Sequence, residues 1–124
     1  MHLILGFGAT GASYLRYLNK RNIPALIMDS RDNPPGLSGF KSLNKENLFL
    51  GGFNQEILDK VVTILVSPGI PYDNEFLLEA RKLNKKIVTD IEIFLKESKS
   101  INILVTGTNG KTTAVSMITH ALKG

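Results

Sequence analysis

The chain has 124 residues, of which 43% are hydrophobic, and its mean hydropathy of +0.04 is typical of one soluble globular domain. Fifteen Lys and Arg residues exceed eleven Asp and Glu residues by four, and the scatter of these basic residues argues against nucleic-acid binding. The absence of cysteine excludes disulfides and thiolate chemistry, and no apolar run reaches the ~20 residues that span a bilayer, so we expect a cytoplasmic protein without membrane insertion.

The first residues show a strand, a glycine turn and a helix. Residues 3–5 are an apolar run that predicts a strand, and residues 12–21 predict a helix. Between them, Gly6, Gly8 and Gly11 form G-x-G-x-x-G, the pattern of dinucleotide-binding turns. The first glycine allows a tight turn, the second lets a phosphate approach the backbone, and the third lets the helix pack closely on the strand. The helix N-terminus then faces the anion.

The next elements alternate in the same way. The run "PALIMD" predicts a second strand that ends at Asp29, at a spacing from which a carboxylate can reach the ribose of NAD. The runs "NLFL", "VTILV" and "KKIVT" predict three more strands, and helices are expected after Asn54, Asn74 and Asp90 as caps. This alternation predicts an α/β fold, a Rossmann-like parallel sheet with crossover helices.

The organisation changes after the polar segment "KSIN". A strand, "NILVT", a turn, "GTNGK", and a helix, "TTAVSMITHALK", follow it. One βα unit cannot cover both faces of its own strand. We therefore expect a Rossmann-like nucleotide-binding domain over residues 1–98, followed over residues 99–124 by a linker and the first βα unit of an incomplete second α/β domain.

The second glycine turn has the core of a phosphate-binding loop. Its backbone N–H groups can surround phosphates, the Lys111 ammonium can reach outer oxygens, and the Thr112 hydroxyl can bind Mg²⁺. The standard spacing places the first glycine at position 105, which is Val105 here, whereas this chain has Gly107. The alternative is an ordinary strand-to-helix turn with an exposed lysine. Neither His2 nor His120 is assigned a role.

The motifs "GFGATG", "MDSRDNPPG", "SPGI", "DIEIF" and "TGTNGKTT" together resemble those of the Mur ligase family over the whole chain. "GTNGKTT" is shared with other ATP-dependent amide ligases, including folylpolyglutamate synthases, whereas "MDSRDNPPG", "SPGI" and "DIEIF" together resemble the D-glutamate-adding branch. The resemblance implies an ATP-dependent acid–amino-acid ligase of peptidoglycan biosynthesis, which acts in cell shape and cell division. In this reaction ATP phosphorylates the carboxylate of UDP-N-acetylmuramoyl-L-alanine, and the amine of D-glutamate displaces phosphate.

The resemblance also implies that the first glycine turn holds UDP. Ala9 and Thr10 would meet the diphosphate, Asp29 would bond to the uracil end, and Arg31 would lie against the uracil ring. Ser30 stands where well-known members have threonine, and it keeps the hydroxyl. The implied UDP-binding residues are Gly8, Ala9, Thr10, Asp29, Ser30, Arg31, Ser67, Pro68 and Gly69. A turn at residues 67–69 that binds no ligand is the alternative for the last three.

For the second turn, the resemblance implies an ATP site. Lys111 would contact the β- and γ-phosphates, Thr112 would bind Mg²⁺, and Thr113 would support the turn; Lys111 and Thr112 are the catalytic candidates. The implied phosphate-binding residues are Gly107, Thr108, Asn109, Gly110, Lys111, Thr112 and Thr113. The rest of the family's catalytic apparatus falls outside these 124 residues, so we expect the chain alone to be inactive.

Two other functions remain open on the sequence alone. An NAD(P)-dependent oxidoreductase or NAD-sensing regulatory protein would use Asp29 on the ribose but would have no use for "GTNGKTT". A nucleotide-binding regulatory protein without catalysis is the other alternative. The oligomeric state is also open.

Overall fold

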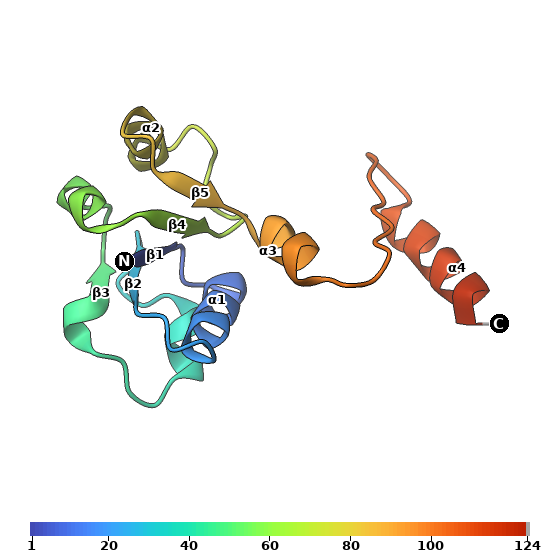
Figure 1. Ribbon diagram of the computed structural model, residues 1–124, viewed down its shortest axis with the longest axis horizontal. Helices are drawn as coiled ribbons and strands as arrows, with labels where there is room; N and C mark the ends of the chain where they lie inside the picture. Colours follow the sequence, from blue (N-terminus) through green and yellow to red (C-terminus); the bar gives the residue numbers. More distant parts are fainter. Residues whose placement is uncertain (124) are drawn as a thin grey trace.

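A five-stranded parallel sheet organises the first 88 residues of the computed structural model, which describes residues 1–123 (Figure 1). The strands lie in the order β3-β2-β1-β4-β5, so β1 is central. Every neighbouring pair is parallel, as the alternation predicts. The strands are β1 (His2–Leu5), β2 (Ala25–Asp29), β3 (Leu48–Leu50), β4 (Thr63–Val66) and β5 (Lys86–Val88).

Helices cover both faces of this sheet and bury two separate apolar clusters. Helix α1 (Ala9–Asn19) packs on one face, and α3 (Asp90–Glu97) contributes Ile93 to the same cluster. Helix α2 (Glu75–Lys82) and the 3₁₀ helix η3 (Gln55–Lys60) pack on the other face. Short 3₁₀ helices η1 (Pro35–Gly39) and η2 (Lys45–Asn47) lie between β2 and β3.

Burial on both faces explains the continuous apolar runs of the central strands. Leu3, Ile4 and Leu5 of β1 are 0% exposed, and all five residues of β2 are buried. Parallel strands covered on both sides characteristically show such runs rather than alternation. Burying one such side chain stabilises the fold by roughly 2 kcal/mol. This core fixes the strand ends that carry the candidate site.

The helix caps agree with the sequence at two of three positions. The Asn54 and Asn74 side chains each accept a hydrogen bond from a backbone N–H two residues later, as predicted. The third cap is Thr89 and not Asp90, which is the first helical residue of α3. Thr89 forms a capping box with Glu92, in which Glu92 Oε2 accepts from the Thr89 N–H at 2.6 Å. This reciprocal pair satisfies two backbone donors, which explains why it determines the helix start.

The predicted start of the first helix also needed correction. Helix α1 begins at Ala9, three residues before the predicted start, because the chain enters the helix directly from the turn with Gly8 as its N-cap. The short helix expected after Asn54 is present as the 3₁₀ helix η3, which ends within six residues.

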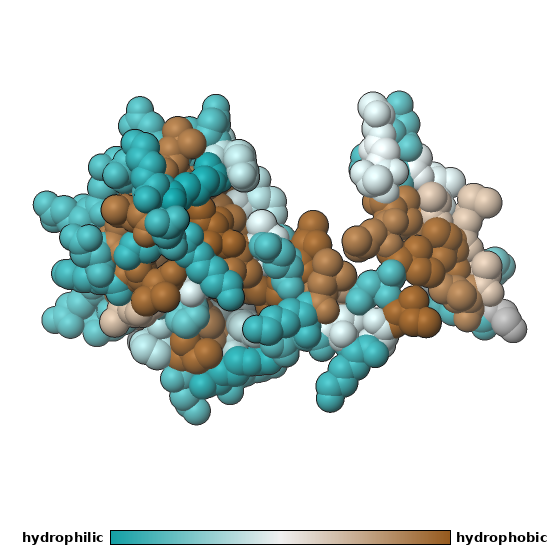
Figure 2. Space-filling view, turned by 45° about the horizontal axis from the view of Figure 1, so that its top comes forward, coloured by the Kyte–Doolittle hydropathy of each residue, from teal (hydrophilic) through white to brown (hydrophobic). Residues whose placement is uncertain are grey.

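The last part of the described chain differs most from its sequence-based prediction. Helix α4 (Lys111–Lys123) forms, but residues 102–106, predicted as a strand, pair with no other strand. A strand forms only when its backbone groups bond to a neighbour, and Figure 1 shows this segment and α4 apart from the sheet. Figure 2 shows apolar residues gathered over the same part. Those that are exposed are Ile101, Ile103, Leu104, Val115, Met117 and Leu122.

None of the helices in residues 1–123 combines the length and the apolar character that a membrane-spanning helix needs.

The capping box gives a first testable prediction. Thr89→Ala removes the side-chain acceptor and should cost ~1 kcal/mol of local stability, measured as faster amide exchange in α3. Asp90→Asn is the matched control, since the substituted side chain keeps the oxygen that accepts from the Ile91 N–H. Equal effects of the two substitutions would contradict Thr89 as the cap.

Candidate functional site

The glycine turn between β1 and α1 is built from three glycines with different surroundings. Gly6 has φ of +87°, a left-handed conformation that favours glycine. A Cβ on Gly11 would lie 2.2 Å from the Gly6 carbonyl oxygen, so only glycine allows α1 to approach β1 this closely. A Cβ on Gly8 would meet nothing within 4 Å. The open space at Gly8 is where a ligand can approach the backbone.

A cavity of about 400 Å³ opens beside this turn, at the carboxyl ends of β1, β2 and β4. Parallel α/β sheets bind ligands at this edge. The nine residues predicted to hold UDP all line this cavity, although they come from three separate segments. The lining residues are Gly6, Gly8, Ala9, Thr10, Asp29, Ser30, Arg31, Ser67, Pro68, Gly69 and Ile70.

Asp29 is the most constrained side chain of this cavity. Its carboxylate is 2% exposed and accepts four hydrogen bonds. The Phe7 N–H donates to Oδ2 at 2.6 Å, and the Arg31 N–H donates to Oδ1 at 2.9 Å. The Arg31 guanidinium adds a bidentate pair, from Nε to Oδ1 at 2.8 Å and from Nη2 to Oδ2 at 2.7 Å. Because a carboxylate offers about four acceptor positions, these internal donors occupy all of them.

These contacts determine the charge states of both side chains. Burial of Asp29 favours its neutral form, but the hydrogen bonds from Arg31 and Phe7 outweigh it and lower the pKa of Asp29 to about 2. The hydrogen bond with Asp29 raises the pKa of Arg31 above its ordinary value. The Arg31 side chain is 52% exposed, although its Nε and Nη2 are both bonded to the Asp29 carboxylate. It therefore presents a fixed, planar cation at the cavity.

Two further contacts hold the turn from the other sides. The Ser67 hydroxyl donates to the Gly6 carbonyl at 2.7 Å, and the Ser67 N–H donates to the Leu5 carbonyl at 2.9 Å. The Gly36 N–H donates to the Phe7 carbonyl at 2.9 Å, and a Cβ on Gly36 would lie 2.6 Å from that oxygen. The only proton of the Ser67 hydroxyl is thus used in a hydrogen bond within the protein. Toward a ligand, this hydroxyl can therefore act only as an acceptor.

Sequence reasoning did not identify three residues that shape the cavity. Ile70 lines it and would be 3.1 Å from a Cβ on Gly6, while Phe7 and Gly36 act through backbone groups. Ile70 is the last residue of the motif "SPGI", so the motif could have predicted its place in the cavity. Backbone contacts leave no signature in residue type, so Phe7 could not have been found in this way.

The second glycine turn lies at the start of α4. Gly110 has φ of +77°, and α4 begins at the next residue. The Lys111 ammonium donates to the Gly107 carbonyl, so the lysine folds back over its own loop. All seven residues predicted to bind ATP phosphates, 107–113, are exposed. The loop and helix start therefore have the order that a phosphate site requires.

The residues for a Mg²⁺ ion at this turn are few. Thr112 supplies one exposed hydroxyl at the helix start. Among residues 1–123, no group of three or more acidic or histidine side chains is placed to hold a metal. Mg²⁺ accepts such a hydroxyl together with phosphate oxygens and water, so Thr112 fits the ion only as one ligand beside a bound nucleotide.

Residues 1–89 match the family of the Mur ligase MurD-like N-terminal domain. The chain belongs to this family. A UDP-N-acetylmuramoylalanine–D-glutamate ligase from Shewanella violacea is 37% identical over 126 aligned positions, which cover 98% of this chain and 28% of that protein. The ligase of the same name from Nitrosococcus oceani is 38% identical over 117 positions, covering 94% of this chain and 26% of that protein. The chain thus spans less than a third of the length of these curated relatives.

A solved structure supports the fold of this MurD-like chain. The chain is similar to the structure of a pseudomurein peptide ligase type C from Methanothermus fervidus, with a TM-score of 0.61 and 24% sequence identity. The match covers 98% of this chain and 26% of that one. At this level of identity the likeness concerns the fold alone. The Mur ligase resemblance seen in the sequence motifs is confirmed by the family match.

The lowered pKa of Asp29 predicts a pH dependence of stability. The folded-state pKa of about 2 is below the value of about 3.9 in an unfolded chain. The ionised carboxylate therefore stabilises the fold by about 2 kcal/mol above pH ~4, and this contribution is lost as the pH falls through ~2. Urea unfolding between neutral and acid pH should show this loss.

Two variants test whether Asp29 causes the loss. Asp29→Asn should remove most of that difference, whereas Asp59→Asn, at an exposed position of η3, should leave it intact. An unchanged acid loss in Asp29→Asn would show that another carboxyl group causes it.

Proposed function

We propose that the cavity at the carboxyl edge holds the UDP moiety of UDP-N-acetylmuramoyl-L-alanine, and that the chain serves an ATP-dependent ligase that adds D-glutamate to it. The family match and the names of the two ligases compared above support this reaction. The choice of UDP over other nucleotides rests on one observation. Internal donors fill all the acceptor positions of the Asp29 carboxylate, and Arg31 is fixed beside it.

The diphosphate fits the start of α1. Helix α1 has no side-chain cap at Gly8, and the first N–H groups of a helix lack partners within it. Ala9 and Thr10 line the cavity there, and Gly8 leaves room above the backbone. These N–H groups and the positive end of the helix dipole suit a diphosphate.

The base fits the opposite side of the cavity. The Arg31 guanidinium is fixed in one plane by Asp29, and planar guanidinium groups stack on aromatic rings. The exposed Ser30 offers a hydroxyl to the edge of the uracil. Asp29 itself acts through Arg31 and Phe7 rather than through a free oxygen.

The same geometry disfavours NAD. Dinucleotide-binding sheets use the carboxylate after the second strand to accept hydrogen bonds from ribose hydroxyls. Here four internal donors fill the Asp29 carboxylate, so a ribose hydroxyl would have to displace one of them. Losing a hydrogen bond to a charged group costs about 1.5–3 kcal/mol.

For the second turn, we propose that residues 107–113 hold the phosphates of ATP. Lys111 would leave the Gly107 carbonyl and contact the β- and γ-phosphates, and Thr112 would provide one ligand to Mg²⁺. When bound, the ion neutralises charge that develops on the transferred phosphoryl group. ATP would phosphorylate the substrate carboxylate, and the D-glutamate amine would then displace phosphate from the acyl phosphate. The relatives named for this reaction extend well beyond the matched part, and we expect no turnover by this chain alone.

Calorimetric titration of the chain with UDP and with NAD tests the assignment of the first site. UDP should bind more tightly than NAD, and Arg31→Lys should weaken UDP binding about tenfold, because lysine cannot form the bidentate pair or stack as a plane. Arg16→Lys is the matched control, since Arg16 lies on α1 and does not line the cavity.

Thermal melting of both variants separates a binding effect from a folding effect. Tighter binding of NAD than of UDP would contradict the proposed function.

A further inference from the structure

A second cavity, of about 430 Å³, lies between α1 and α3 on the face of the sheet that these helices cover. Its polar lining comes from the strands through His2, Thr63 and Lys86, from α1 through Tyr17, and from α3 through Glu92 and Lys96. It shares no lining residue with the cavity at the glycine turn. The two cavities are therefore separate.

Strand register places three of these residues in one row. His2 of β1 is paired with Thr63 of β4, and Thr63 is paired with Lys86 of β5. Neighbouring strands lie ~4.8 Å apart, so an imidazole, a hydroxyl and an ammonium stand side by side. The row lies at the first residues of β1, β4 and β5, where His2 and Thr63 are partly buried and Lys86 is exposed. The three polar groups therefore border a cavity that solvent and small ions can reach.

The charges around this row are predominantly positive. Lys86 and Lys96 bring two ammonium groups, and neither forms an ion pair within residues 1–123. The opposing charge is Glu92 on α3: its Oε2 accepts from the N–H and hydroxyl of Thr89, and these bonds together with the charge of Lys86 lower the pKa of Glu92.

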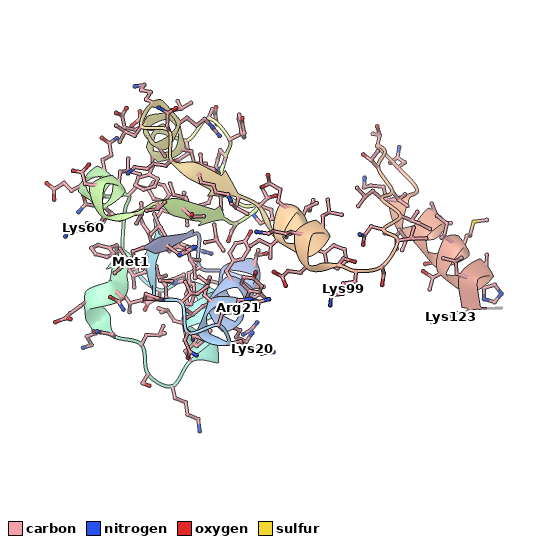
Figure 3. All side chains as sticks on the ribbon, viewed as in Figure 1. Met1, Lys20, Arg21, Lys60, Lys99 and Lys123 are labelled. Atoms are coloured by element: carbon pink, nitrogen blue, oxygen red, sulfur yellow. The ribbon has the colours of Figure 1, made fainter. Side chains whose placement is uncertain are left out.

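The other nearby carboxylate is also occupied. Glu97 accepts from Tyr17 at 2.8 Å and from Arg21 at 2.6 Å, and Arg21 follows α1 on the side toward α3 (Figure 3). Glu97 is thus engaged by Tyr17 and Arg21, and the positive charges of Lys86, Lys96 and the N-terminus around the cavity exceed the one negative charge of Glu92.

We propose that this cavity is a second binding site, which takes a phosphate dianion or the phosphate group of a small metabolite. Thr63 would donate its hydroxyl, and Lys86 on β5 and Lys96 on α3 would supply positive charge. Two ammonium groups favour a dianion over a singly charged carboxylate. The site is independent of the proposed nucleotide function, since it lies on other residues.

His2 provides a built-in reporter of an anion in this cavity. Burial lowers its pKa, and the N-terminal ammonium and Lys86 lower it further. The charged groups around it are Lys86, Lys96, Glu92 and the N-terminus. A bound dianion would favour the imidazolium, so binding must raise the pKa of His2. His120 on α4 is the internal reference.

The test is an NMR titration of both histidines in this chain with inorganic phosphate, at ionic strength held constant with sodium chloride. The pKa of His2 should rise saturably, the pKa of His120 should stay unchanged, and acetate should bind more weakly than phosphate. Lys86→Ala and Lys96→Ala should each weaken phosphate binding about tenfold, the loss expected for one charge-assisted hydrogen bond.

Lys60→Ala is the control for net charge, because Lys60 does not line this cavity and lies on η3, which packs on the other face of the sheet. Equal effects of Lys60→Ala and Lys86→Ala would show general screening and overturn the proposal, as would an unchanged pKa of His2. Phosphate that binds only at the 107–113 loop would shift the amides of that loop, would survive Lys86→Ala, and would also overturn it.

Discussion

Four hydrogen bonds to one buried carboxylate hold together the parts of this chain that form its main site. Asp29 ends β2, yet it binds the Phe7 N–H of the turn after β1 and the backbone and guanidinium of Arg31. A buried carboxylate without these donors would be costly. The glycine turn and the loop after β2 are therefore fixed relative to each other before any ligand arrives.

The parallel sheet makes this arrangement available. Because neighbouring strands run in one direction, the ends of β1, β2 and β4 meet at one edge, and Ser67 can bond to Gly6 across it. The groups left unoccupied at this edge are the N–H groups at the start of α1 and the exposed face of Arg31. In the proposed function, these backbone groups and this cation, rather than an acidic side chain, would select the ligand.

Most of the fold could be predicted from the sequence, since apolar runs and asparagine caps carry a local signal. The glycine spacing also indicated the helix–strand approach that Gly11 permits. The strand predicted at 102–106 failed because an apolar run does not reveal whether a pairing neighbour exists. The cap at Thr89 was missed because Asp90 and Thr89 are both good caps, and only the partner Glu92 decides between them.

The motifs predicted which residues lie together at the cavity, but not the hydrogen bonds that these residues make. Motif order brought together residues from three segments, and the structure places all nine on one cavity. The sequence does not contain the distances between segments. It therefore could not predict that four internal donors fill the Asp29 carboxylate or that Ser67 bonds to Gly6.

A crystal structure of the chain with UDP would test the proposed nucleotide site most directly. We predict that the diphosphate binds at Ala9 and Thr10 and that the uracil lies on Arg31, with all four internal donors still on Asp29. A ribose hydroxyl bonded to Asp29 in place of Arg31 would contradict this.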